Sequence, residues 1–334
     1  MKVVGFGDFM IHFSPIMDER FLQSRLVQMS FTGAEANVCA ALGLWGEETE
    51  FVTRLPEHLL AQSGISFLKS LSVGTAYMEQ GPGRMGTYYL EKGSGVRPSV
   101  VIYDRVPSAF TASSFDDYRW DEIFQDADWF YVTGITPALS DNLLECTVLA
   151  MKEAHKRGIG VCYDVNFRPK LLTAAKAKEN FDRLKGYISY LIGNEEHLKM
   201  LLQIDSRYGE QQRKERLRDI AYQAAEITGI SNVAVTVRRT PSASEAVFSA
   251  AYLSQGEFAV SPEYRLQVVD RVGSGDAFSA GLIYGMIHKM VPEDAVCFAA
   301  AASAMKHEIV SDINYSTVAE IEALKKQQGY DVRR

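Results

Sequence analysis

The stretch Val269-Asp270-Arg271-Val272-Gly273-Ser274-Gly275-Asp276-Ala277-Phe278 joins a strand-like segment to an apolar helix that the sequence predicts over residues 277–290. Gly273 and Gly275 let the backbone turn sharply, which exposes consecutive N–H groups at the positive end of that helix. Such a loop binds an anion. The neighbouring carboxylate of Asp276 has two interpretations: it caps the helix, or it is a general base that takes a hydroxyl proton while the amides hold phosphoryl charge.

The segments before and after this loop alternate between strands and helices over most of the chain. This alternation predicts parallel βαβ units and a sheet covered on both faces, which is an α/β fold. Residues 10–31 and 75–105 are instead short-stranded and irregular, and we expect them to form a small separate sheet. The predicted strands of the body are 3–6, 50–53, 129–133, 159–164, 187–192 and 233–237, and the predicted helices are 34–45, 56–71, 141–157, 211–226, 277–290 and 292–306, with another starting at 195.

Two other glycine-containing stretches fail as nucleotide-binding loops. Residues 81–86 match G-x-G-x-x-G, but residues 87–90 favour a strand where a dinucleotide site needs a helix. The loop after the first strand has Met10 where a third glycine is required, and the sequence contains no G-x-x-x-x-G-K-[ST] motif. These observations disfavour a nicotinamide oxidoreductase and exclude a P-loop enzyme.

Composition narrows the class of protein further. The 334 residues are 47% hydrophobic and 23% charged, which is enough to bury a large core, and the net charge is −7 without any basic block. We therefore expect neither nucleic acid nor a membrane surface as a partner. The sequence has no signal-peptide pattern and no run of 18 apolar residues, so we expect a cytoplasmic protein. The cysteines are predicted to be reduced core thiols, because they lack metal-type spacing: Cys39, Cys146, Cys162 and Cys297.

Two motifs from opposite ends of the chain resemble the signatures of the ribokinase-like (PfkB) family of sugar kinases. They are Gly33-Ala34-Glu35-Ala36-Asn37, with its following helix, and Asp270-x-x-Gly273-Ser274-Gly275-Asp276. Their order and separation fit that family, as does the strand and helix pattern between them. The resemblance implies one domain over residues 1–334, a three-layer α/β fold with a mostly parallel central sheet, and a β-sheet lid formed by about 10–31 and 75–105.

A third motif narrows the substrate. The run Asp164-Val-Asn166-Phe-Arg168-Pro-Lys-Leu171 resembles the D-x-N-x-R-P-K-L run of 2-keto-3-deoxygluconate (2-dehydro-3-deoxygluconate) kinases, as do Tyr88, the triplet 103–105 and the stretch 304–312. This resemblance implies ATP-dependent phosphorylation of the 6-hydroxyl, giving 2-keto-3-deoxy-6-phosphogluconate. Arg105 independently suits a carboxylate, because its guanidinium is a planar and permanently charged donor fork.

The resemblance assigns roles to individual positions. Asp276 is the expected catalytic base, and Gly273, Ser274 and Gly275 form the expected anion hole. Tyr88 and Tyr103 could instead serve lid packing or a subunit interface, and Arg168 could pair with an acidic neighbour. The expected substrate-binding residues are Gly33, Asn37, Tyr88, Tyr103, Arg105, Arg168 and Asp312, and the expected ATP-binding residues are Asn166, Arg168, Asn194, Arg238, Gly273 and Gly275.

Three departures from the family pattern limit this transfer. His197 stands where Asn-x-x-Glu normally places a glutamate, so no ligands are assigned to the Mg²⁺ that would arrive with ATP. Arg271 stands where many relatives have Thr, which leaves a monovalent-cation site open. Residues 237–241 replace the usual Lys-x-Gly-rich nucleotide loop, so contacts to adenine are not assigned.

Several alternatives stay open at this point. A PfkB kinase acting on fructose or on 2-keto-3-deoxygalactonate is one, and a non-catalytic sugar-acid sensor on the same scaffold is another. Because a small sheet with exposed aromatic and β-branched residues is an aggregation liability, we expect two subunits to associate through the lid.

Overall fold

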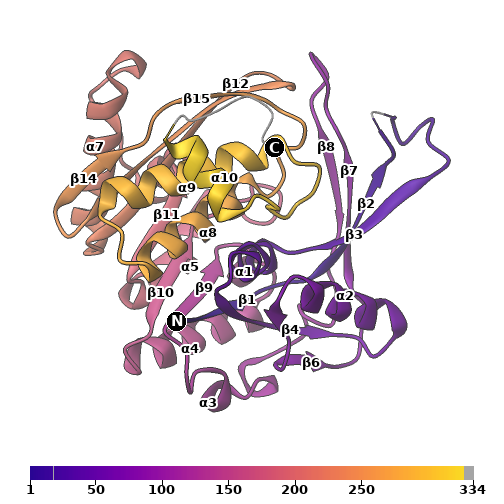
Figure 1. The fold of residues 1–334 in the computed structure, drawn as a ribbon. Coiled ribbons are helices and arrows are strands. Elements are labelled where there is room, and N and C mark those ends of the chain that lie inside the picture. Colours follow the sequence, from indigo (N-terminus) through magenta and orange to yellow (C-terminus); the bar gives the residue numbers. More distant parts are fainter. Residues whose placement is uncertain (18, 327–334) are drawn as a thin grey trace.

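The computed structural model describes residues 1–17 and 19–326. Within them, the central sheet has eleven strands, and its main path runs β14-β13-β12-β11-β10-β9-β1-β4-β5. The path from β12 to β5 is parallel, whereas β13, β14 and β15 add an antiparallel extension at one edge (Figure 1). The strands are β1 (Lys2–Phe6), β4 (Glu48–Leu55), β5 (Val73–Gly74), β6 (Met78–Gln80), β9 (Trp129–Thr133), β10 (Gly160–Asp164), β11 (Tyr190–Asn194), β12 (Asn232–Ser242), β13 (Glu245–Ser254), β14 (Glu257–Val260) and β15 (Tyr264–Gln267).

The apolar composition of the central strands follows from burial on both faces. In β10, Val161 and Tyr163 point into one hydrophobic core while Cys162 points into the other. Strand β9 divides its residues in the same way, with Phe130 in the first core and Tyr131 in the second. Because successive side chains of a strand point to opposite faces, both faces must be apolar when helices cover both.

Helices form the two outer layers. One layer contributes to the core around Val161, and the other to the core around Cys162, whereas α2 packs beside β4 and the base of the lid. The first layer is α3 (Trp120–Ile123), α4 (Asp141–Lys156), α5 (Ala174–Leu184), α6 (Glu195–Leu202) and α7 (Arg213–Thr228); the second is α1 (Ala34–Leu44), α8 (Ser274–Ile287), α9 (Pro292–Lys306) and α10 (Val318–Lys325); and α2 is Leu59–Ser70. Single 3-10 turns occur at Phe115–Asp117, Thr136–Ala138, Lys185–Tyr187 and Glu210–Gln212. The expected three-layer α/β architecture is confirmed.

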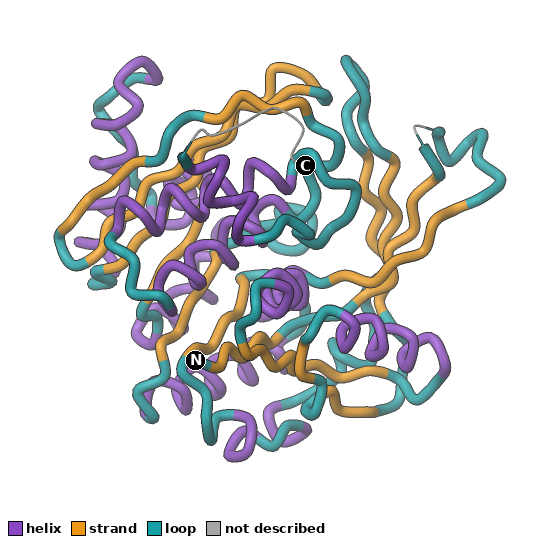
Figure 2. The backbone as a smooth tube through the Cα atoms, viewed as in Figure 1, coloured by secondary structure: helices purple, strands orange, loops and turns teal. Residues whose placement is uncertain are grey.

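A separate four-stranded sheet forms the lid, which extends from one side of the body (Figures 1 and 2). Its order is β3 (Val27–Thr32), β2 (Met10–Pro15), β7 (Gly86–Glu91) and β8 (Val100–Asp104), and all neighbours are antiparallel except β2 and β7. One cross-strand row, through His12, Tyr88 and Tyr103, lies on the face toward the body. The next row lies on the outer face and consists of Met29, Phe13, Tyr89 and Ile102.

The structure corrects several predicted boundaries. Helix α2 begins at Leu59 and not near Pro56, because the His58 ring accepts a hydrogen bond from Ala61 N–H at 3.1 Å and caps it there. Helix α8 begins at Ser274, three residues before the predicted start. Strand β6 pairs with β4, so residues 78–80 belong to the body and the second lid segment begins at Gly86. Residues 18 and 327–334 of the predicted domain lie outside the described residues.

Two sequence expectations about burial can also be compared with the structure. Cys39, Cys146 and Cys162 are buried and Cys297 is half-buried, and all four are free thiols, as predicted. No helix in residues 1–17 and 19–326 is both long enough and apolar enough to cross a membrane.

Candidate active site

A cleft of about 540 Å³ opens between the carboxyl ends of the parallel strands and the inner face of the lid. Asp164 ends β10 and Asn194 ends β11, which is where parallel α/β sheets place their ligands. The cleft is lined by every residue that the sequence analysis assigned to a site except Asp312: Gly33, Asn37, Tyr88, Tyr103, Arg105, Asn166, Arg168, Asn194, Arg238, Gly273, Ser274, Gly275 and Asp276.

The predicted anion hole lies at the N-terminus of α8. Gly273 is the N-cap with φ of 78°, and a Cβ at this position would clash with the backbone carbonyl of Asp312, so a glycine is required. The first N–H groups of the helix have no partner within it and carry the positive end of its dipole. Gly275 has open space where a side chain would stand, which leaves these N–H groups accessible.

Asp276 occupies the first turn of the same helix and is almost completely buried. Asn37 Nδ2 donates to its Oδ2 at 2.8 Å, while Asn37 Oδ1 accepts from Thr32 Oγ1 at 3.1 Å and so fixes the orientation of the amide. Burial raises the pKa of Asp276 to about 7; the Asn37 hydrogen bond lowers it, and the nearby Asp164 carboxylate raises it. Helix α8 has no side-chain cap, so this geometry favours a base near neutral pH over a helix cap.

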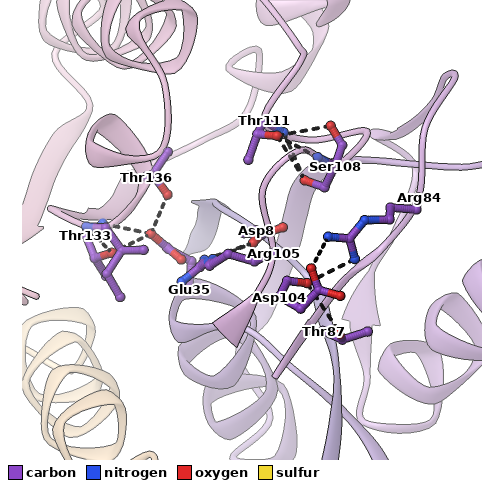
Figure 3. Close-up of polar contacts among 11 residues, drawn as sticks. Asp8, Glu35, Arg84, Thr87, Asp104, Arg105, Ser108, Thr111, Thr133 and Thr136 are labelled. Atoms are coloured by element: carbon purple, nitrogen blue, oxygen red, sulfur yellow. Dashed lines mark hydrogen bonds and ion pairs between the residues drawn. The ribbon is translucent and has the colours of Figure 1, made fainter. Parts of the chain in front are cut away.

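Two further buried carboxylates, for which no role was predicted, lie near enough to Asp276 to raise its pKa. Burial raises the pKa of Asp164 to about 6, although Asn166 N–H donates to it at 3.0 Å. Burial also raises the pKa of Glu35, whose Oε1 accepts from Thr133 N–H, Thr133 Oγ1 and Thr136 Oγ1 at 3.0, 2.8 and 2.9 Å (Figure 3). Both residues stand inside the quoted motifs, but nothing local to those motifs indicates that they meet.

Three arginines, Arg168, Arg238 and Arg271, also line the cleft. Arg238 Nη1 donates to Ser274 Oγ at 3.2 Å. Burial lowers the pKa of Arg238, and the nearby charges of Arg271 and Arg168 lower it further. None of these three guanidiniums forms an ion pair with any residue in the described part of the chain. Burial, with Arg168 and Arg238, lowers the pKa of His197 to about 4, so its ring is neutral. Converging and unneutralised guanidiniums favour a polyanionic ligand such as a triphosphate.

The lid contributes aromatic side chains and one arginine. The Tyr103 ring lies 5.9 Å from the Tyr88 ring and 5.6 Å from the Arg105 guanidinium. Arg105 is buried and donates through Nε and Nη2 to Asp8 Oδ2 at 3.1 and 2.8 Å (Figure 3). No motif in the sequence indicates this ion pair, which fixes the guanidinium at the edge of the cleft.

Asp312 lies outside the lining of the cleft, and its role in orienting the substrate stays a prediction. Asp312 accepts a hydrogen bond from Tyr88 Oη, and His12 Nδ1 lies 3.3 Å from its Oδ2. Burial favours the neutral form of Asp312, but the bonds from His12, Tyr88 and Thr32 outweigh it and hold its pKa below the ordinary value. The His12 ring also stacks on Tyr88 with centroids 4.3 Å apart. Asp312 and His12 therefore position Tyr88.

Comparison with known proteins agrees with this geometry. The family model described as pfkB family carbohydrate kinase matches residues 1–316. This chain is a PfkB-family carbohydrate kinase. It is similar to the crystal structure of a 2-dehydro-3-deoxygluconokinase from Thermotoga maritima, with 36% identity, 98% coverage of both chains and a TM-score of 0.94. It is also 30% identical to a 2-dehydro-3-deoxygalactonokinase from Haloferax volcanii, over 96% of this chain and 95% of that one.

PfkB kinases bind ATP and Mg²⁺. Both are present in the complex of a putative ribokinase II from E. coli, which shares this fold with a TM-score of 0.77 at 16% identity. Within residues 1–17 and 19–326 no three His, Cys, Asp or Glu side chains cluster as a metal site. Mg²⁺ in kinases is usually bound through one or two carboxylates, substrate phosphates and water.

We predict that Asp276→Asn retains the fold but loses phosphoryl transfer by about 10²–10⁴-fold, the usual contribution of a general base. Asp294→Asn is the matched control, because Asp294 holds the equivalent third position of α9 and is exposed to solvent. The measurements are kcat and thermal unfolding for both variants. Turnover by Asp276→Asn within a few-fold of wild type would mean that Asp276 has only a structural role.

We also predict an acidic limb in the pH profile of kcat/KM with an apparent pKa of about 7, because the base must be ionised to accept a proton. Activity should fall as pH decreases through this value. In Asn37→Ala the limb should move to higher pH, since the hydrogen bond that lowers the Asp276 pKa is lost. The midpoint of the limb is read independently of the maximal rate. An unmoved midpoint would show that another group controls the profile.

Proposed function

We propose that this PfkB kinase transfers the γ-phosphoryl group of ATP to the 6-hydroxyl of 2-keto-3-deoxygluconate. The observation that carries the proposal is the position of Asp276. Its carboxylate, whose pKa is raised to about 7, lies beside an open helix N-terminus, and Arg105 is held at the lid end of the same cleft. Similarity to the 2-dehydro-3-deoxygluconokinase of Thermotoga maritima supports this choice of substrate. ATP as the donor also supports a cytoplasmic location.

The phosphoryl end of the cleft accounts for the transfer step. Asp276 takes the proton of the substrate hydroxyl as its oxygen attacks the γ-phosphorus, and the bond from that phosphorus to the bridging oxygen of ADP breaks. The N–H groups of residues 273–276 stabilise the charge on the equatorial oxygens. Arg168 and Arg238 hold the donor phosphates, with Asn166 and Asn194 at the adjacent strand ends. Mg²⁺ arriving with ATP would neutralise part of the phosphate charge.

The lid end of the cleft accounts for substrate choice and for protection from water. Arg105 offers charge to the carboxylate of a sugar acid, while Tyr88 and Tyr103 face the sugar. Gly33 and Asn37 lie at the start of α1 next to the reacting hydroxyl. Closing the lid over the sugar excludes water, which would otherwise compete for the phosphoryl group.

The epimer 2-keto-3-deoxygalactonate is the second candidate, and the 30% identity to the Haloferax volcanii enzyme favours it. The two sugar acids share the carboxylate and differ in the configuration of one hydroxyl, so Arg105 serves either. A panel containing both epimers, fructose and other neutral hexoses, assayed with ATP, tests the proposal. Preference for a neutral hexose would reject a sugar-acid kinase, and binding without ADP formation would indicate a sensor.

The contribution of Arg105 to substrate choice can be isolated from its ion pair. Arg105→Ala alone leaves the buried Asp8 carboxylate without its partner, which would perturb the lid for any substrate. We therefore predict that Asp8→Asn/Arg105→Ala, compared with Asp8→Asn, loses about 10²-fold in kcat/KM for the sugar acid but changes little for a neutral hexose. Equal losses for acid and neutral substrates would mean that Arg105 only supports the lid.

We further propose that two copies associate through the outer faces of their lids. The row formed by Met29, Phe13, Tyr89 and Ile102 crosses all four strands there, and Phe13 and Tyr89 stack with centroids 5.5 Å apart. Met29 and Ile102 are 44% and 54% exposed. A continuous apolar row on an exposed sheet favours a second apolar sheet as its partner, and an identical lid supplies one.

Substitution in this outer row tests the association. Ile102→Asp should convert a dimer to a monomer at micromolar concentration, because a buried unpaired carboxylate is costly at an apolar interface. Val291→Asp is the matched control: Val291 is 59% exposed and precedes α9, away from the lid. Sedimentation equilibrium measures both. A wild-type chain that stays monomeric would reject the proposed interface.

A further inference from the structure

Lys306, the last residue of α9, is completely buried behind the anion hole. Its Nζ donates to the backbone carbonyl of Asp270 at 3.2 Å and to that of Ile309 at 3.0 Å. Lysine is almost never fully buried without compensation, and the charge has no role in the transfer step described above. The carboxylates of Asp270 and Asp312 are its oppositely charged neighbours.

The two carbonyls belong to different loops, so Lys306 joins them. Asp270 begins the loop that leads to Gly273, and Ile309 lies in the segment after α9. The same segment supports the loop elsewhere: His307 O accepts from Val269 N–H and Asp270 N–H at 2.8 and 3.0 Å. Ser303 Oγ donates to Ser274 O at 2.8 Å. The position of the anion-hole N–H groups therefore depends on the segment that carries Lys306.

Carbonyl oxygens from two loops that converge on one positive charge are the ligands that proteins also offer to a small monovalent cation. The resemblance to the PfkB family did not decide whether a monovalent cation binds near Arg271. The residues present here do not fit a separate ion between these loops, because the ammonium group of Lys306 already takes a carbonyl oxygen from each. We propose that Lys306 acts as a built-in monovalent cation that positions the anion hole, so that this kinase needs no K⁺ for activity.

The electrostatics of the surroundings support a charged Lys306. Burial lowers the pKa of Lys306 and the ammonium of Lys92 lowers it further, whereas the carboxylates of Asp270, Asp312 and Asp276 raise it. Lys92 shares the charge of Asp270, with its Nζ 3.1 Å from Oδ2. A fixed positive charge behind the loop also favours the negative charge that develops in front of it during transfer. Lys306 touches no substrate, so it is a positioning residue.

The first test measures wild-type kcat in chloride salts of K⁺, Na⁺ and choline at equal ionic strength. We expect equal rates in all three. The assay uses whichever sugar the wild-type chain phosphorylates, so the inference rests on kinase activity and not on the proposed sugar acid. If the proposed sugar acid is wrong, the substrate panel with the wild-type chain shows it. Several-fold activation of the wild type by K⁺ would instead overturn the proposed role of Lys306.

The second test replaces the ammonium. Lys306→Ala should lower kcat by about 10–10²-fold, the usual effect of removing an outer supporting partner, and K⁺ or NH₄⁺ should restore part of it while choline should not. Lys306→Met fills the space without charge and should not be restored. Lys325→Ala is the control, since Lys325 likewise ends a helix, α10, but is ion-paired with Asp294 away from the anion hole. If Lys306→Met folds and keeps wild-type kcat, or if both variants lose only thermal stability, the proposal is overturned.

Discussion

The hydrogen bond from Asn37 to Asp276 joins residues that are 239 positions apart, and the rest of the active site is arranged around it. It can form only because α1 and α8 pack together on one face of the sheet, with Val38 and Phe278 in the same core. This packing places Asn37 beside the first turn of α8, which carries both the Asp276 carboxylate and the free N–H groups. The bond also holds the carboxylate still and limits the rise in its pKa, so one contact serves both geometry and protonation.

This arrangement has a cost in folding free energy. Asp276, Asp164 and Glu35 are buried near one another, and burial raises the pKa of each. At neutral pH the ionised forms are therefore less favourable in the folded chain than in the unfolded chain. The apolar layers on both faces of the sheet offset this cost. The hydrogen bonds from Thr133, Thr136 and Asn166 reduce it further, and Thr133 and Thr136 do so from outside the lining of the cleft.

Because successive side chains of a β-strand point to opposite faces, each lid strand presents one set of residues to the cleft and another to the outer face. Tyr88 and Tyr103 face the cleft, while their neighbours Tyr89 and Ile102 face outward. Tyr88 is in turn bonded to Asp312, which follows α9 in the body. The lid and the anion-hole loop therefore meet the same short segment, because Asp312 also packs its carbonyl against Gly273 and Lys306 precedes it by six residues. Residues 306–312 therefore contact both the lid and the anion-hole loop.

The alternation of strands and helices, the separate small sheet, the glycine-containing loop before α8 and thirteen of the residues that line the cleft could be predicted from the sequence. These features depend on local patterns: apolar periodicity, glycine turns and motifs within a few residues. Only the tertiary structure decided that Arg105 pairs with Asp8, that Asp312 supports Tyr88 from behind, and that Lys306 holds two carbonyls. It also moved the start of α2 to the residue after His58, whose ring caps that helix. Side-chain partners distant in sequence are set by the register and packing of whole elements, and no local pattern encodes that register.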